Sequence, residues 1–138
     1  MTDFASAPRS PRIYVTAEDL ARLQALAGDR AEAPGPRMLL DELDRAVVVT
    51  DAGARRFVRL GSLVSYEDRA RGQTRTVRLV EPAEADVDAG RISVLTPVGA
   101  ALIGMTEGAA ILWTDERGRR HDLKVLAVDA APSSGAAA

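Results

Sequence analysis

Apolar residues in the first half of the chain recur at helical spacing in two stretches. In the first stretch, Leu20, Leu23 and Ala27 fall on one helical face. Thr16 precedes this face and can cap the helix, and Gly28 follows it as a C-terminal stop. The pattern therefore predicts a helix of about a dozen residues that begins after Thr16.

A second helix is predicted after a polar loop that ends at Pro36, a residue that fits the first turn of a helix. Its apolar positions are Leu39, Leu40, Leu43, Ala46 and Val47. Asp41 and Arg45 are four residues apart, which is the spacing of an ion pair on the outer face of a helix. Together the two helices predict a short antiparallel hairpin over residues 13–50, ~18 Å long at ~1.5 Å per residue.

The second half of the chain changes from helical spacing to β-branched runs divided by glycine. The five strands expected there are residues 62–66, 74–80, 92–95, 109–113 and 122–128. Turns at Arg71-Gly72 and Arg117-Gly118 make two hairpins, and Pro97 can begin one helical turn between the third and fourth strands. The pattern predicts an α+β chain: a helical hairpin at 13–50, a linker near residues 50–53, and an antiparallel sheet domain with one short helix at 57–129.

Composition narrows the classes of function. The 138 residues carry 18 Lys and Arg against 20 Asp and Glu, so the formal charge of −2 does not favour direct nucleic-acid binding. The chain has no cysteine, which excludes disulfides, thiol catalysis and thiolate metal sites. No apolar run approaches the ~18 residues of a membrane span, and the N-terminus lacks an apolar signal core, so we expect a cytoplasmic protein. Residues 1–12 and 130–138 are expected to be unstructured, because they have too few apolar residues to form a core.

The most specific motif of the chain runs from Ile92 to Gly104 and reads ISVLTPVGAALIG. It resembles the C-terminal domain of the bacterial transcript-cleavage factors GreA and GreB, in which an isoleucine-serine strand precedes Ser/Thr-Pro-x-Gly-x-Ala-Leu-Leu-Gly. Residues 60–64 and 81–86 are similar to the first strand and the acidic connection of that domain. The similarity covers residues 57–128 and implies an FKBP-like fold.

The length of the hairpin distinguishes the branches of this family. Gre factors carry a much longer coiled coil, whose acidic tip reaches through the secondary channel of RNA polymerase to the catalytic metal. With its short hairpin and the sequence LDELDRA at residues 40–46, the chain is similar to the Rnk family, the regulators of nucleoside diphosphate kinase. This resemblance implies a non-enzymatic transcription regulator that binds core RNA polymerase near the secondary channel and competes with Gre-type factors. We expect no cofactor, no membrane partner, no sequence-specific contact with nucleic acid, and a monomer.

The resemblance implies that the partner contact lies at Thr96, Pro97, Val98 and Gly99. In this interpretation the turn is exposed and docks on a pair of helices at the rim of the polymerase channel. In the alternative interpretation, Pro97 and Gly99 only shape the connection from strand to helix, and Val98 belongs to the core. Both interpretations can hold for different residues of the segment.

Asp29 and Glu32 fall at the tip of the predicted hairpin. They resemble the two acidic residues with which Gre factors help to hold a second magnesium ion, a role that suits carboxylates because hard cations take oxygen ligands. The alternative is that both are solvated loop charges, since a hairpin of ~18 Å does not reach a deep active site. We expect no metal site within the chain, because His121 is the only histidine.

Two enzyme functions remain as alternatives. The first is an FKBP-like peptidyl-prolyl isomerase, which needs an apolar pocket lined by aromatic residues. Two Phe, two Tyr and one Trp in the whole chain make such a pocket hard to build. The second is a true transcript-cleavage factor, which the short hairpin opposes. We therefore expect no catalytic residues.

Overall fold

The computed structural model describes residues 11–50 and 56–129. Residues 51–53 of the predicted linker and the ends expected to be unstructured, apart from Pro11 and Arg12, lie outside the described residues. In chain order the elements are β1 (Tyr14–Thr16), α2 (Ala17–Gly28), α3 (Pro34–Asp44), β2 (Val47–Val49), β3 (Leu63–Asp68), β4 (Gln73–Val80), η2 (Pro82–Glu84), η3 (Val87–Ala89), β5 (Arg91–Ser93), α4 (Pro97–Leu102), β6 (Ala110–Thr114) and β7 (Arg120–Asp129). The predicted α+β fold, a helical hairpin followed by a sheet with one short helix, is confirmed.

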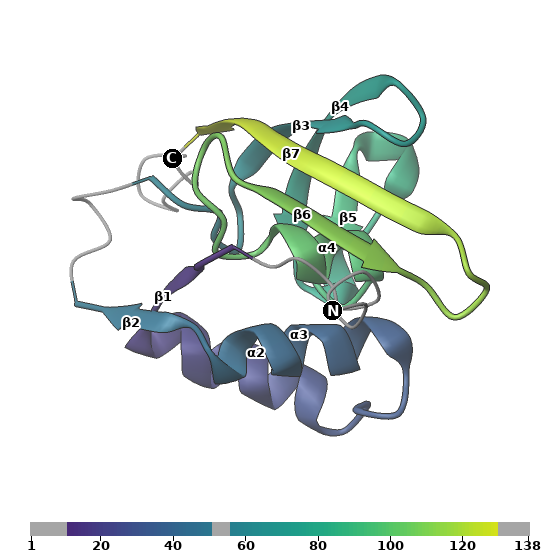
Figure 1. The fold of residues 1–138 in the computed structure, drawn as a ribbon. Coiled ribbons are helices and arrows are strands. Elements are labelled where there is room, and N and C mark those ends of the chain that lie inside the picture. Colours follow the sequence, from purple (N-terminus) through teal and green to yellow (C-terminus); the bar gives the residue numbers. More distant parts are fainter. Residues whose placement is uncertain (1–10, 51–55, 130–138) are drawn as a thin grey trace, which may run out of the picture.

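Five strands form one sheet in the order β5-β4-β3-β7-β6 (Figure 1). The pairs β3–β4, β3–β7 and β6–β7 are antiparallel, whereas β4 and β5 run parallel. The sheet is thus mostly antiparallel, and β5 is the exception because η2 and η3 carry the chain back before it begins. Gly72 and Gly118 adopt positive φ angles of 67° and 82° in the two predicted hairpin turns, where a side chain would be strained.

The first helix begins as predicted. The hydroxyl of Thr16 accepts a hydrogen bond from the main-chain N–H of Asp19 at 3.1 Å, which caps α2. The prediction that Asp41 pairs with Arg45 is wrong, because Arg45 instead forms its ion pair with Glu42, three residues before it and largely buried.

The structure corrects the end of the second helix. The chain leaves α3 after Asp44, and Val47, predicted on the helical face, begins strand β2. The physical reason is the run of three valines, since β-branched side chains favour an extended chain. Strand β2 pairs parallel with β1, Tyr14 opposite Val47, and the N–H of Val47 donates to the carbonyl oxygen of Ile13 at 2.9 Å. The chain therefore enters and leaves the helical hairpin at the same place.

The helical hairpin lies against the sheet domain and shares its core. Helix α3 packs on α4, which Figure 1 shows between the sheet and the hairpin. One cluster of buried residues joins both halves, with Leu39 and Leu43 from α3 and Leu102 from α4 among its members. The connection is reinforced at the surface, where Arg59 Nε donates to Asp19 Oδ2 at 2.9 Å. Among the described residues, no helix is long and apolar enough to cross a membrane.

Candidate functional site

The predicted docking segment forms the first turn of α4. The hydroxyl of Thr96 accepts the N–H of Gly99 at 3.1 Å and donates to the carbonyl oxygen of Ser93 at 2.8 Å. Pro97 is the first residue of the helix, where a missing N–H costs no hydrogen bond. The side chains of Thr96 and Pro97 are exposed, so this turn has a fixed shape and faces solvent.

The other two predicted contact residues are less accessible. Val98 is partly buried and packs on the core cluster. Gly99 is buried, and a Cβ atom at this position would lie 2.2 Å from the carbonyl oxygen of Ser93. Gly99 therefore serves the close approach of α4 to β5, and the surface available to a partner consists of Thr96, Pro97 and part of Val98.

The second predicted set lies in the loop that joins α2 to α3. Asp29 and Glu32 are both exposed there. The loop is held by main-chain hydrogen bonds from Arg30 to Ala27 and from Ala33 to Arg30, each 3.0 Å long. Within residues 11–50 and 56–129, no group of three or more histidine, cysteine or acidic side chains is placed to hold a metal ion. The two carboxylates thus supply at most part of a coordination shell.

The start of α3 lies directly against the segment that precedes α4. A Cβ atom at Gly35 would lie 1.8 Å from the carbonyl oxygen of Leu95, so only glycine permits this contact. The hairpin tip and the turn at Thr96 therefore belong to the same end of the molecule. The hairpin is a packed part of the fold and not an arm that projects from it.

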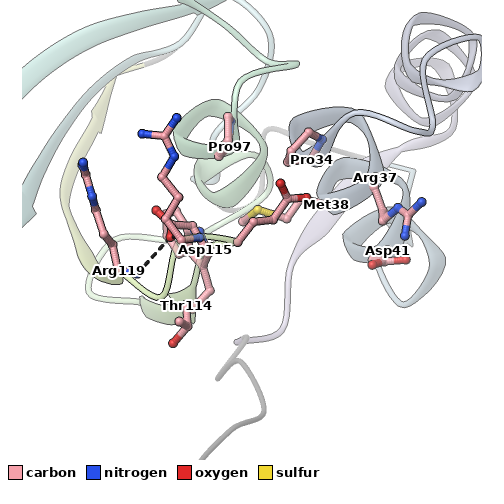
Figure 2. A pocket seen from close by; sticks show the side chains of 11 residues that line it. Pro34, Arg37, Met38, Asp41, Pro97, Thr114, Asp115 and Arg119 are labelled. Carbon is pink, nitrogen blue, oxygen red and sulfur yellow. Dashed lines mark hydrogen bonds between the residues drawn. The ribbon is translucent and has the colours of Figure 1, made fainter.

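Beside this contact the structure has a cleft of about 450 Å³ that no pattern in the sequence predicts (Figure 2). Its walls come from α3, the start of α4, and the end of β6 with the turn that follows. The lining residues are Pro34, Arg37, Met38, Asp41, Pro97, Trp113, Thr114, Asp115, Glu116, Arg117 and Arg119. Most of the lining surface is apolar, with charged side chains around it. No sequence motif marks the cleft, because its residues come from three separate stretches of the chain.

Asp115 organises the β6–β7 turn at one side of the cleft. Its Oδ1 atom accepts the main-chain N–H groups of Arg117 and Arg119, each at 2.9 Å, and its Oδ2 atom shares a hydrogen bond of 2.9 Å with Nε2 of His121. These hydrogen bonds lower the pKa of Asp115 to about 2, and the bond with His121 contributes most to the shift. The ring of His121 also stacks on that of Trp113, with 4.6 Å between centroids. A two-residue turn at Arg117-Gly118 would place Asp122 opposite Trp113, whereas the observed register is shifted by one residue and places His121 there, so the sequence does not predict this pair.

Comparison with known families divides the chain into two matched regions. Residues 54–130 match the family described as transcription elongation factor, GreA/GreB, C-terminal. Residues 11–49 match the Rnk N-terminus. The described part of the first region contains the sheet, α4 and the turn at Thr96, and the second contains the helical hairpin.

Individual relatives agree with these matches. The regulator of nucleoside diphosphate kinase of Escherichia coli strain K12 is 32% identical over 127 residues, which are 90% of this chain and 93% of that protein. The transcription elongation factor GreA of Syntrophobacter fumaroxidans is 46% identical over 68 residues, 49% of this chain and 43% of that protein. A transcription inhibitor protein Gfh1 of Thermus thermophilus is 37% identical over 92 residues, 65% of this chain and 58% of that protein. The chain thus spans about half the length of the GreA and Gfh1 relatives.

A solved structure shows the same arrangement of elements. The prokaryotic transcription elongation factor GreA/GreB from Nitrosomonas europaea superposes with a TM-score of 0.66 at 30% sequence identity. The superposition covers 88% of this chain and 100% of that one. The two proteins therefore share one fold over nearly their whole length.

Proposed function

Because the chain belongs to the Rnk branch of the GreA/GreB transcription-factor family, we propose that it regulates transcription without catalysis by binding core RNA polymerase near the secondary channel. In this position it competes with Gre-type factors for the same site. Regulation of nucleoside diphosphate kinase, the role that gives the Escherichia coli relative its name, is part of this proposal.

The observation that carries this proposal is the packing of the hairpin. Helix α2 has 12 residues and is therefore ~18 Å long. The close contact of Gly35 with Leu95 keeps the start of α3 beside the docking turn. A factor built in this way can occupy the entrance of a channel through Thr96 and Pro97, while Asp29 and Glu32 stay near the entrance. Competition without cleavage is the activity that this geometry favours.

The test is a competition experiment on stalled elongation complexes made with core polymerase and a Gre-type cleavage factor. The protein is expected to inhibit transcript cleavage in proportion to its concentration, and more cleavage factor is expected to reverse the inhibition. The Pro97→Glu variant is expected to need about tenfold more protein for the same inhibition, because a charge replaces an apolar contact at the centre of the surface. Glutamate is compatible with the first turn of α4, so the fold is retained.

Val87→Glu provides the matched control. Val87 lies in η3 and is 80% exposed, so this variant also places a glutamate at an exposed apolar position, outside the docking turn. We expect it to inhibit like the unchanged protein. Equal inhibition by Pro97→Glu and the unchanged protein would show that the turn does not make the contact, and no inhibition by the unchanged protein would refute polymerase competition altogether.

A further inference from the structure

Strand β6 has one unpaired edge. It is the last strand of the sheet and pairs only with β7. The N–H of Asp115 donates to the carbonyl oxygen of Arg119, and the N–H of Val125 donates to that of Ala109, both at 2.9 Å. In an antiparallel pair the main-chain groups alternate in direction, so these two bonds make the N–H and C=O groups of Leu112 and Thr114 point away from β7. Among the described residues, these outward groups have no hydrogen-bond partner.

The unpaired edge borders the cleft. Trp113 and Thr114, at the end of β6, both line it. The facing wall carries Met38 from α3 and Pro97 from α4, as Figure 2 shows. A chain segment laid along β6 would thus meet main-chain donors and acceptors on one side and apolar side chains on the other. Extended peptides are recognised by this combination, in which the sheet gains a strand and a pocket takes a side chain.

Two arginines without an ion-pair partner at the rim of the cleft favour an acidic occupant. Arg117 and Arg119 lie on the turn next to the end of β6, and neither forms an ion pair with any described residue. The carboxylate of Asp115 already accepts two main-chain N–H groups and binds His121, which leaves Glu116 as the only uncommitted acid of this turn. The charges of Asp115, Glu116, Arg117 and Arg119 cancel, but two guanidinium groups and only one carboxylate of this turn lack a partner among the described residues, so the turn can still bind an anionic group.

Across the cleft the charges balance. Figure 2 shows Arg37 and Asp41 together on α3, on the opposite side from Arg119. This wall contributes no net charge, so the preference for an anionic group comes from the turn. A carboxylate bound at this rim of the cleft would find guanidinium partners, and Arg is well suited to bind carboxylates through parallel N–H donors.

We propose that the cleft binds an extended acidic peptide segment of a partner protein, which adds to β6 as a sixth strand. The outward N–H and C=O groups of Leu112 and Thr114 pair with the main chain of the peptide. One apolar peptide side chain enters the cleft between Met38 and Trp113, and a carboxylate binds Arg117 and Arg119. This site goes beyond the proposed docking on polymerase, and its test uses the purified protein alone.

The probe is the acetylated and amidated peptide Glu-Leu-Val-Leu-Glu. Trp113 is the only tryptophan of the chain, so its fluorescence reports directly on the cleft. We expect a saturable change in this fluorescence, together with slower hydrogen exchange at the N–H of Thr114. A peptide with lysine in place of glutamate is expected to bind at least about fivefold more weakly, from the loss of two exposed ion pairs. The same peptide with N-methylated central amides is expected not to bind, because it cannot add to a strand.

Variants of the edge separate main-chain pairing from charge. Thr114→Pro removes an N–H that points away from β7, so the ladder with β7 is kept, and proline is tolerated on edge strands in this orientation. It is expected to weaken peptide binding about five- to tenfold relative to Thr114→Ala, which keeps the N–H. The pair Arg117→Glu with Arg119→Glu is expected to weaken binding of the acidic peptide and strengthen that of the lysine peptide.

Three outcomes would overturn the proposal. The first is equal binding of the N-methylated and unmodified peptides, and the second is equal binding of the peptide by folded Thr114→Pro and Thr114→Ala. The third is pairing of β6 with a second copy of the chain, which sedimentation would detect as a mass that doubles with concentration and reverts in Thr114→Pro. Unfolding curves of Thr114→Pro, and of the double variant Arg117→Glu with Arg119→Glu, establish that each remains folded.

Discussion

Asp115 and His121 face each other across the β6–β7 turn, with 2.9 Å between Oδ2 and Nε2. The hydrogen bonds to this carboxylate lower its pKa to about 2, the bond with His121 contributing most. A carboxyl group whose pKa is lower in the folded chain stabilises the fold above its unfolded pKa of ~3.9. This stabilisation is lost as the pH falls through the folded value of about 2.

Asp115→Asn is therefore expected to lower the free energy of unfolding at pH 7, and the difference from the unchanged protein is expected to shrink between about pH 4 and pH 2. Urea unfolding at several pH values measures this difference. Glu116→Gln is the control, since it changes an exposed acid of the same turn that forms no hydrogen bond with a described residue, and it is expected to unfold like the unchanged protein at pH 7. A difference that stays constant down to pH 2 would contradict the assigned role of Asp115.

The contact between Gly35 and Leu95 predicts a strong effect of a single methyl group. Gly35→Ala is expected to lower the free energy of unfolding by about 1–3 kcal/mol, because the helix must shift away from the carbonyl oxygen of Leu95. Gly28→Ala is the matched control: nothing lies within 4 Å of a Cβ atom there, and alanine favours a helix. Chemical unfolding of both variants measures these free energies. If Gly35→Ala is as stable as the unchanged protein, α3 is not held against the segment before α4 as described.

The packed hairpin predicts that the protein does not stimulate cleavage of backtracked transcripts. Asp29 and Glu32 lie at the tip of helices ~18 Å long, too short to carry them deep into a channel. Asp29→Asn with Glu32→Gln is expected to leave inhibition of a Gre-type factor unchanged. Stalled elongation complexes provide the assay. Cleavage by the unchanged protein that this double variant abolishes would mean that the tip does reach the catalytic metal.

The described aromatic residues predict no peptidyl-prolyl isomerase activity. An isomerase must lower a barrier of ~18–20 kcal/mol, and FKBP-like folds require an apolar pocket for this purpose. Tyr66 and Phe57 are buried, and Trp113 is the one aromatic residue that lines the cleft. A proline tetrapeptide assay at micromolar protein should show the uncatalysed rate. A faster rate that Trp113→Leu removes in a folded variant would establish the enzyme function instead.

Local signals in the sequence predicted most of the secondary structure. The cap at Thr16, the glycine turns at Gly72 and Gly118, and the start of α4 at Pro97 each depend on a few neighbouring residues, and the structure has all of them. Val47 was misplaced because its spacing continues the helical pattern while its β-branched neighbours favour a strand. Periodicity alone does not decide between these two signals.

Features that depend on distant residues were not predictable in the same way. The contact of Gly35 with Leu95 joins positions 60 residues apart, and nothing near Gly35 in the sequence shows that a carbonyl group will approach it. The cleft arises only when α3, α4 and the β6–β7 turn pack together, and the free edge of β6 follows from the order of the strands in the sheet. The motif at Thr96–Gly99 was recognised, but only the structure separates the exposed Pro97 from the buried Gly99.

The parallel pairing of β1 with β2 also has a mechanical consequence. In a parallel pair the start of one strand and the end of the other lie at opposite ends, so a pull on residues 13 and 50 slides the strands past each other. The hydrogen bonds of the pair, among them that of Val47 with Ile13, then resist together rather than opening one after another. A pull between residues 13 and 50 is therefore borne first by these two short strands, and the helices between them are loaded only after the strands have slipped.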